Sequence, residues 1–157
     1  MEQLKISGVA KDTNVVRIAI EGVPDEPGIS FKVFRALAKK KINVDIILQS
    51  VGRNNTNDIS FTVAKGDEEE AVRVMKEIGE IIGAEKVSAD ENVAKVSIVG
   101  AGMVSSSGIA ALMFEALYDA KINIKMISTS EIKVSVLIDA DCADRAVQAI
   151  HNKFFGD

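Results

Sequence analysis

The turn at Asp25–Ser30 carries the groups that a free amino acid requires of a binding site. A helix that begins after Gly28 leaves its first backbone N–H groups without partners in the helix, and these suit the ligand carboxylate. The Asp25 carboxylate suits the ligand ammonium, and glycine at position 28 lets a ligand approach the backbone. The pattern also allows a purely structural interpretation, in which Asp25 caps the helix and Pro27 begins it.

Other polar residues offer little for catalysis. His151, the only histidine, lies near the end of a predicted helix without a nearby metal-ligand partner, so we expect an exposed or capping role. Val99–Gly102 follows a predicted strand as a dinucleotide-binding turn does, but Ser105 occupies the third glycine position. The triple serine Ser105–Ser107 has no companion base and indicates a helix N-cap. The sequence therefore predicts no catalytic residue, no metal site and no cofactor.

The chain contains an internal repeat eighty residues apart. The segments Gly28–Ser50 and Gly108–Ser130 share ten identities in twenty-three positions without a gap. A repeat of this length is typical of a duplicated small domain. In the second copy Ser105 takes the position of Asp25, so the charged acceptor is absent there. We therefore expect the two copies to differ in ligand affinity.

Composition limits the classes of function. The 157 residues are 47% hydrophobic and 27% charged, which is ample for a packed core. A net charge of −4, no basic run and no Trp make nucleic acid an unexpected partner. The longest apolar runs are far shorter than the ~20 residues that a bilayer requires, so we expect a cytoplasmic protein without a membrane partner. With Cys142 as the only cysteine, no intramolecular disulfide can form.

The first copy predicts the element order βαββαβ. Its apolar spacing and turn residues indicate strands at Val15–Glu21, Asn43–Ser50, Asp58–Val63 and Glu85–Ala89, a turn at Gly22–Gly28, a polar hairpin turn at Gly52–Asn57, and helices starting near Ile29 and covering Ala71–Ile82. This order is that of a split βαβ, or ferredoxin-like, unit: a four-stranded antiparallel sheet with two helices on one face.

The second copy repeats this order but ends one strand short. It predicts strands at Val93–Val99, Asn123–Ser130 and Ile132–Ile138, and helices at about Ser107–Ala120 and Cys142–Phe154. The segment Leu4–Ala10 has no equivalent in the repeat and supplies the missing strand in the simplest completion. The predicted fold is thus α+β, with a first ferredoxin-like domain (residues 15–90) inserted in a second (residues 1–14 and 91–157).

Several segments also carry a family resemblance. They are Asp25–Gly28, Phe34–Ala38, Val99–Met103 and above all Ile127–Ile132. With these the chain resembles, over nearly its whole length, the regulatory region of aspartate kinases, a tandem pair of amino-acid-binding ACT domains with the first inserted in the second. The resemblance implies that the catalytic domain, which binds ATP and aspartate, is absent here. The chain would then be a regulatory subunit or fragment and no enzyme on its own.

The resemblance further implies a homodimer formed through ACT domains, with L-threonine and in many members L-lysine bound between chains and inhibiting the catalytic subunit. Matching motif positions give one wall of the site as Asp25, Gly28, Ile29, Ser30 and Gln49, and the other as Asn123 and Ile124 of the partner chain. Glu131 either pairs with the side-chain ammonium of lysine or is an exposed charge at a strand end. The alternatives are a stand-alone ACT-type amino-acid sensor and a dimerisation module that binds no ligand.

Overall fold

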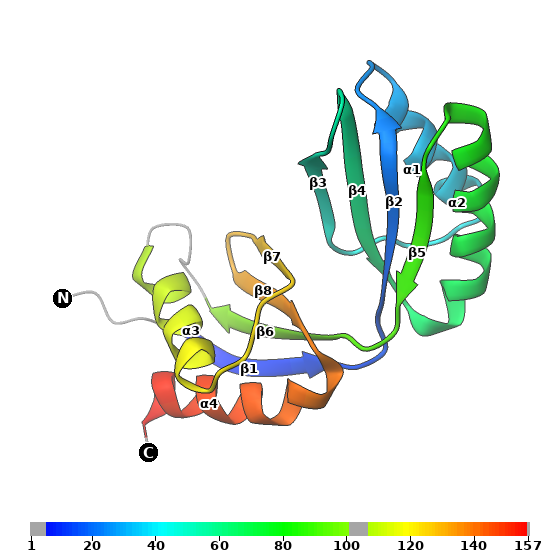
Figure 1. Ribbon diagram of the computed structural model, residues 1–157. Helices are drawn as coiled ribbons and strands as arrows, with labels where there is room; N and C mark the ends of the chain where they lie inside the picture. Colours follow the sequence, from blue (N-terminus) through cyan, green and yellow to red (C-terminus); the bar gives the residue numbers. More distant parts are fainter. Residues whose placement is uncertain (1–5, 101–106, 157) are drawn as a thin grey trace. The chain divides into compact units, whose positions relative to one another are not determined.

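The computed structural model describes residues 6–100 and 107–156 (Figure 1). The chain divides into two compact units. The central unit comprises Asn14–Glu91, and the flanking unit combines Met1–Thr13 with Asn92–Asp157. Each unit has its own sheet and its own helices, and each is described by itself below.

The central unit is a four-stranded antiparallel sheet with two helices on one face (Figure 1). Its elements are β2 (Val16–Pro24), α1 (Ile29–Lys39), β3 (Ile47–Val51), β4 (Thr56–Val63), α2 (Glu68–Ile82) and β5 (Lys86–Asp90). The strand order is β3-β4-β2-β5, so β3 and β5 form the two edges. This is the predicted βαββαβ order.

The flanking unit has the same architecture. Its elements are β1 (Ile6–Asp12), β6 (Ala94–Gly100), α3 (Ser107–Asp119), β7 (Met126–Thr129), β8 (Lys133–Ile138) and α4 (Ala143–Phe155). The strand order is β1-β6-β8-β7, and β1 pairs antiparallel with β6 at one edge. The predicted fold class, two antiparallel four-stranded sheets with helices on one face, is confirmed. Of the segment Leu4–Ala10, the first two residues lie outside the described chain.

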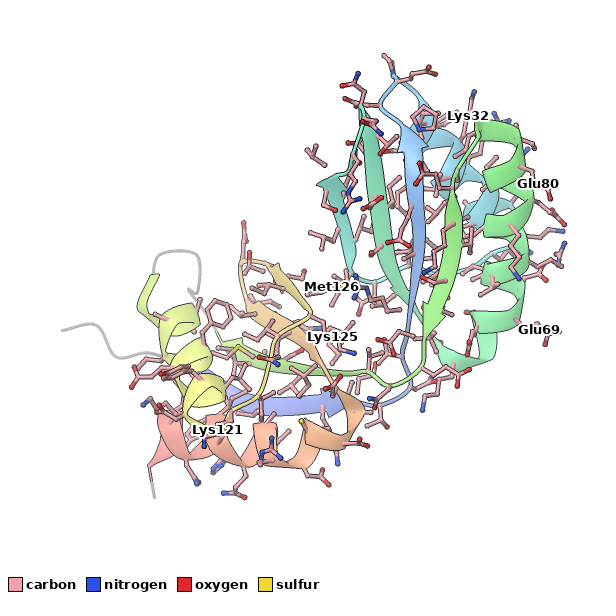
Figure 2. All side chains as sticks on the ribbon, in the orientation of Figure 1. Lys32, Glu69, Glu80, Lys121, Lys125 and Met126 are labelled. Carbon is pink, nitrogen blue, oxygen red and sulfur yellow. The ribbon has the colours of Figure 1, made fainter. Side chains whose placement is uncertain are left out.

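Each unit has a separate apolar core between its sheet and its helices. In the central unit β2 and β4 supply Ile18, Ile20 and Phe61, and the helices supply Leu37 and Met75, all of them buried. The core forms because alternate strand residues and one stripe of each helix are apolar. Figure 2 shows Glu69 and Glu80 on the side of α2 that faces away from the sheet.

Several predicted boundaries are wrong by two to four residues, and tertiary hydrogen bonds account for the largest differences. β2 runs on to Pro24, where a turn was predicted from Gly22, because a bulge lets the strand continue. β3 begins at Ile47 and not at Asn43, since the backbone before it bonds to a side chain: the Ile46 amide donates to Thr62 Oγ1 at 3.0 Å. β7 likewise begins at Met126 and not at Asn123.

Candidate amino-acid-binding site

A bulge in β2 determines where the chain leaves the central sheet. The register of β2 on β4 shifts between Ile20 and Val23, and Gly22 has the left-handed φ of 69°. The Gly22 amide turns to donate to Asp58 Oδ1 at 2.9 Å. Glycine adopts this φ without the steric cost that a Cβ would bring. The bulge therefore carries β2 beyond its regular pairing and delivers Asp25 to the β3–β4 hairpin.

The β3–β4 hairpin holds Asp25 through two hydrogen bonds, one from its turn and one from the start of β4. Asn54 and Asn55 have φ of 54° and 61°, the geometry of a type I′ turn, which asparagine tolerates better than most residues. The Asp25 amide donates to the Asn55 carbonyl at 3.1 Å. The Asn57 side-chain amide donates to Asp25 Oδ1 at 3.0 Å. The carboxylate is therefore exposed but anchored at one oxygen.

Helix α1 begins directly after this turn, and the expectation that Asp25 caps it is wrong. The N-cap residue is Gly28, with φ of 89°, and no side chain of the described structure makes a cap hydrogen bond there. The Asp25 side chain contacts the hairpin instead. As in any α-helix, the first backbone amides, including those of Ser30 and Phe31, have no acceptor within the helix. Together with the positive end of the helix dipole, they suit an anion.

Helix α1 and edge strand β3 meet through two predicted site residues. The Ser30 hydroxyl donates to Gln49 Oε1 at 3.1 Å, and Gln49 is exposed on β3. Since the amide oxygen of Gln49 accepts this bond, its NH₂ group is the part that can serve as a donor to a ligand. Ile29 is only 6% exposed and packs in the core, so only its backbone can face a ligand.

The structure therefore gathers one part of the predicted site within the central unit. Asp25, Gly28, Ile29 and Ser30 follow one another along the turn and the start of α1, and Gln49 lies beside Ser30. Asn123, Ile124 and Glu131 belong to the flanking unit instead. Asn123 is exposed and Ile124 half-buried in the connection between α3 and β7, and Glu131 is exposed between β7 and β8. Ser105 lies outside the described residues.

Sequence reasoning missed Asn57 as a part of this site. It was assigned to a polar turn, whereas the structure places it within β4, 9% exposed. The available signal was a polar residue directly before the predicted strand Asp58–Val63. An amide that the strand buries needs a hydrogen-bond partner, so Asn57 was a candidate for a specific contact. Its partner was not visible from the sequence, since the bulge at Gly22 sets the register.

Of the remaining candidates, the structure describes His151, whereas residues 101–106, which include parts of Val99–Gly102 and Ser105–Ser107, lie outside the described residues. His151 is exposed on α4, and its ring lies 4.8 Å from the ring of Phe155, centroid to centroid. Among residues 6–100 and 107–156, no group of three or more His, Cys, Asp or Glu side chains is arranged to hold a metal ion. No helix in that part of the chain combines the length and the hydropathy needed to cross a membrane.

Shifted pKa values occur on α2 and α4. Burial, a hydrogen bond to Glu91 and the charge of Glu91 all raise the pKa of Glu68 at the start of α2. A hydrogen bond from Arg73 lowers the pKa of Glu70. On α4, the hydrogen bond to Glu115 raises the pKa of Lys153. These shifts accompany a carboxyl pair and ion pairs of the helices.

Comparison with known proteins defines the class of this pair of units. A family model described as ACT domain matches residues 18–78 and 96–154, one stretch in each unit. The aspartokinase of Pseudomonas aeruginosa is 47% identical over 154 residues, which are 98% of this chain and 37% of that protein. The aspartokinase of Helicobacter pylori strain 26695 is 48% identical over 151 residues, 96% of this chain and 37% of that protein. Fold and family match together define a tandem pair of ACT domains.

Solved structures extend the comparison to separate regulatory subunits. The crystal structure of aspartokinase alpha and beta subunits has a TM-score of 0.89 and 45% identity, covering 96% of this chain and 99% of that one. The ligand-free regulatory subunit of aspartate kinase from Thermus thermophilus has a TM-score of 0.90 and 41% identity, covering 95% and 99%. This chain belongs to the ACT domain family and, within it, to the regulatory regions of aspartate kinases. It spans 37% of the length of these two curated relatives.

Proposed function

We propose that this chain binds L-threonine, with L-lysine as a second effector, and mediates feedback inhibition of an aspartate kinase in amino-acid biosynthesis. One observation carries the proposal: the Ser30–Gln49 hydrogen bond joins the start of α1 to edge strand β3, next to an Asp25 carboxylate anchored at one oxygen. An acceptor for an ammonium and amides for a carboxylate thus lie on one short segment. The similarity to regulatory subunits of aspartate kinase supports the regulatory role.

Each group has a defined part in holding the ligand. The free oxygen of Asp25 accepts from the ammonium of the amino acid, and the amides at the start of α1, near Ser30, receive its carboxylate. The NH₂ group of Gln49 and the side chain of Asn123 bind the hydroxyl of threonine. Glu131 pairs with the side-chain ammonium when lysine binds. Gly28 leaves space for the ligand beside the backbone.

The second wall of the site comes from a partner chain in a homodimer formed through the ACT domains. All five residues of β3 are exposed, and Val51 is 88% exposed, so the strand offers both an unpaired edge and apolar side chains. Such an edge invites pairing with another chain. In the dimer, Asn123 and Ile124 of the partner would close the pocket. The domains would be residues 15–90, and residues 1–14 with 91–157.

Inhibition follows from a shift of population. An effector that binds between two chains stabilises the closed dimer by its differential affinity for that state. A coupling of about 1–3 kcal/mol between effector and catalytic subunit is enough to lower kinase activity several-fold. The phosphorylation of L-aspartate by ATP takes place on the catalytic part, in the cytoplasm. This chain contributes the sensor.

Calorimetric titration with L-threonine tests the proposal. Asp25→Ala and Gln49→Ala are each expected to weaken binding about tenfold or more, because each removes a hydrogen bond to a polar or charged ligand group. Glu80→Ala, on the outward side of α2 (Figure 2), is the control and should bind as the wild type does. Unchanged affinity in both site variants would refute the site assignment.

The exposed edge of β3 also fits a dimerisation module that binds no ligand, and the Asp25 turn would equally suit an ACT-type sensor for another amino acid. A thermal-shift series with all proteinogenic amino acids separates these functions, since a ligand that binds only the folded state raises the melting temperature. A rise with threonine supports the proposal. A rise with an amino acid outside the aspartate pathway indicates the other sensor, and no rise with any of them indicates the dimerisation module.

A further inference from the structure

We infer that Asn57 is a positioning residue that aims the Asp25 carboxylate at the ligand ammonium, an inference that rests on the proposed function. Asn57 itself does not reach the ligand in this assignment. It acts through the hydrogen bond from its side-chain amide to Asp25 Oδ1, at 3.0 Å. The inference adds a positioning residue on β4 to a site otherwise built from the turn, α1 and β3.

The place of Asn57 in the sheet makes it a rigid support. It pairs with Val23 on β2 and with Val51 on β3, and it is 9% exposed. A buried amide costs free energy unless it is hydrogen-bonded, so the bond to Asp25 is strongly favoured over leaving the amide without a partner. The backbone of β4 holds the Asn57 side chain in place, and its amide in turn holds the Asp25 carboxylate.

Asp25, by contrast, needs such support. Its side chain is exposed and follows the strand end, where it would otherwise sample several rotamers. The backbone bond from its amide to Asn55 holds only the main chain. Donation to Oδ1 restricts the carboxylate to one orientation and leaves Oδ2 for a ligand. Because fewer rotamers are lost on binding, the affinity rises by preorganisation.

The second copy of the repeat provides an internal comparison through the strand register. Ser60 on β4 pairs with Ala19 on β2 and Leu48 on β3. Ser135 on β8 pairs with Ser97 on β6 and Ser128 on β7, so Ser60 and Ser135 occupy equivalent positions in the two sheets. Three residues before them stand Asn57 in the central unit and Ile132 in the flanking unit.

Ile132 is 59% exposed and has no side-chain donor. The repeat alignment places Ser105 at the position of Asp25. The flanking copy therefore lacks both the acceptor and the donor of this pair, although it keeps the fold. The donor is thus absent where its acceptor is absent, as expected of two residues that act as a pair.

A double-mutant cycle on the full chain tests the inference by calorimetry with L-threonine. Asn57→Leu has nearly the shape of asparagine but no donor, and it should weaken binding about tenfold in the wild-type background. In an Asp25→Ala background, which lacks the acceptor of this hydrogen bond, the same change should weaken the remaining binding less than twofold. Asn54→Gly is the matched control in the same hairpin, where the positive φ suits glycine, and it should leave the affinity unchanged.

The outcomes separate the two claims. An equal loss in both backgrounds, or no loss in the wild-type background, would overturn the role of Asn57 and leave the proposed function intact. Failure of the wild type to bind threonine would overturn the proposed function and this inference with it. Thermal melting of each ligand-free variant checks that it folds. Asn57→Ser, whose shorter side chain does not span the gap to Asp25, carries the same test should the leucine variant not fold.

Discussion

Replacing Gly28 with alanine separates the backbone strain at the start of α1 from the space that a ligand needs there. Gly28 has φ of +89°, and among the described residues no heavy atom lies within 4 Å of an added Cβ. Gly83, which ends α2, matches it, with φ of +82° and the same free space. In both positions the only cost to the free protein is therefore a left-handed conformation for a residue with a Cβ, about 1–2 kcal/mol.

Both variants should consequently lose the same stability. For a chain of this size the loss corresponds to a melting temperature lower by about 2–8 °C. Threonine affinity should separate them, because only the new methyl group at position 28 lies where the ligand carboxylate approaches the first amides of α1. We expect Gly28→Ala to weaken binding tenfold or more, and Gly83→Ala less than twofold.

Denaturant unfolding and calorimetric titration of the two variants measure these quantities side by side. Equal affinities in Gly28→Ala and Gly83→Ala would refute the close approach of a ligand to the backbone at the start of α1. A stability loss confined to one variant would show that the strain at the two glycines differs. It would refute the reasoning from φ.

Three further predictions concern the core, the sheet edge and the carboxyl pair. Phe61→Ala removes a side chain that is fully buried against Phe34 and should cost the central unit about 3–5 kcal/mol in denaturant unfolding. Val51→Lys places a charge on the exposed edge of β3 and should raise the dissociation constant of the proposed dimer in analytical ultracentrifugation without lowering monomer stability. The pKa of Glu68 is higher in the folded chain than its ordinary value of 4.5, so the stability from this group is complete below pH 4.5 and is lost as the pH rises through the folded-state pKa. Glu91→Gln removes the neighbouring charge and should reduce this loss, by less than about 1 kcal/mol, in unfolding curves measured between pH 4 and 7.

The sequence predicted the architecture well because its signals are local. Apolar periodicity placed the helices α1, α2, α3 and α4, and the turn residues separated the strands, so the βαββαβ order of the central unit and the βαββα order of the second copy could be predicted from the chain alone. Even the end of the first helix in each copy is repeated: Lys41 and Lys121 both take a left-handed φ, 57° and 59°. Element boundaries were less accurate, since the start of β3 depends on Thr62, a residue far along the chain.

The candidate site was only partly predictable from the sequence. Residue types at Asp25, Gly28 and Ser30 indicate an amino-acid site because they lie together on one turn, and a local segment is all that sequence reasoning requires. The sequence did not predict the hydrogen-bond partner or the burial of each of these residues. The tertiary structure decided that Asp25 bonds to the hairpin and does not cap α1, that the Ile29 side chain belongs to the core, and that Asn57 supports the carboxylate.

The sequence by itself thus determined the duplicated fold and the chemistry offered by the turn, because both follow from residue types at short spacing. The partners of those residues were decided only by the tertiary structure. The β-bulge at Gly22 shifts the pairing of β2 on β4, and a shift of register changes which side chains face each other across a sheet. That register, which no local pattern encodes, brings Asn57 to Asp25.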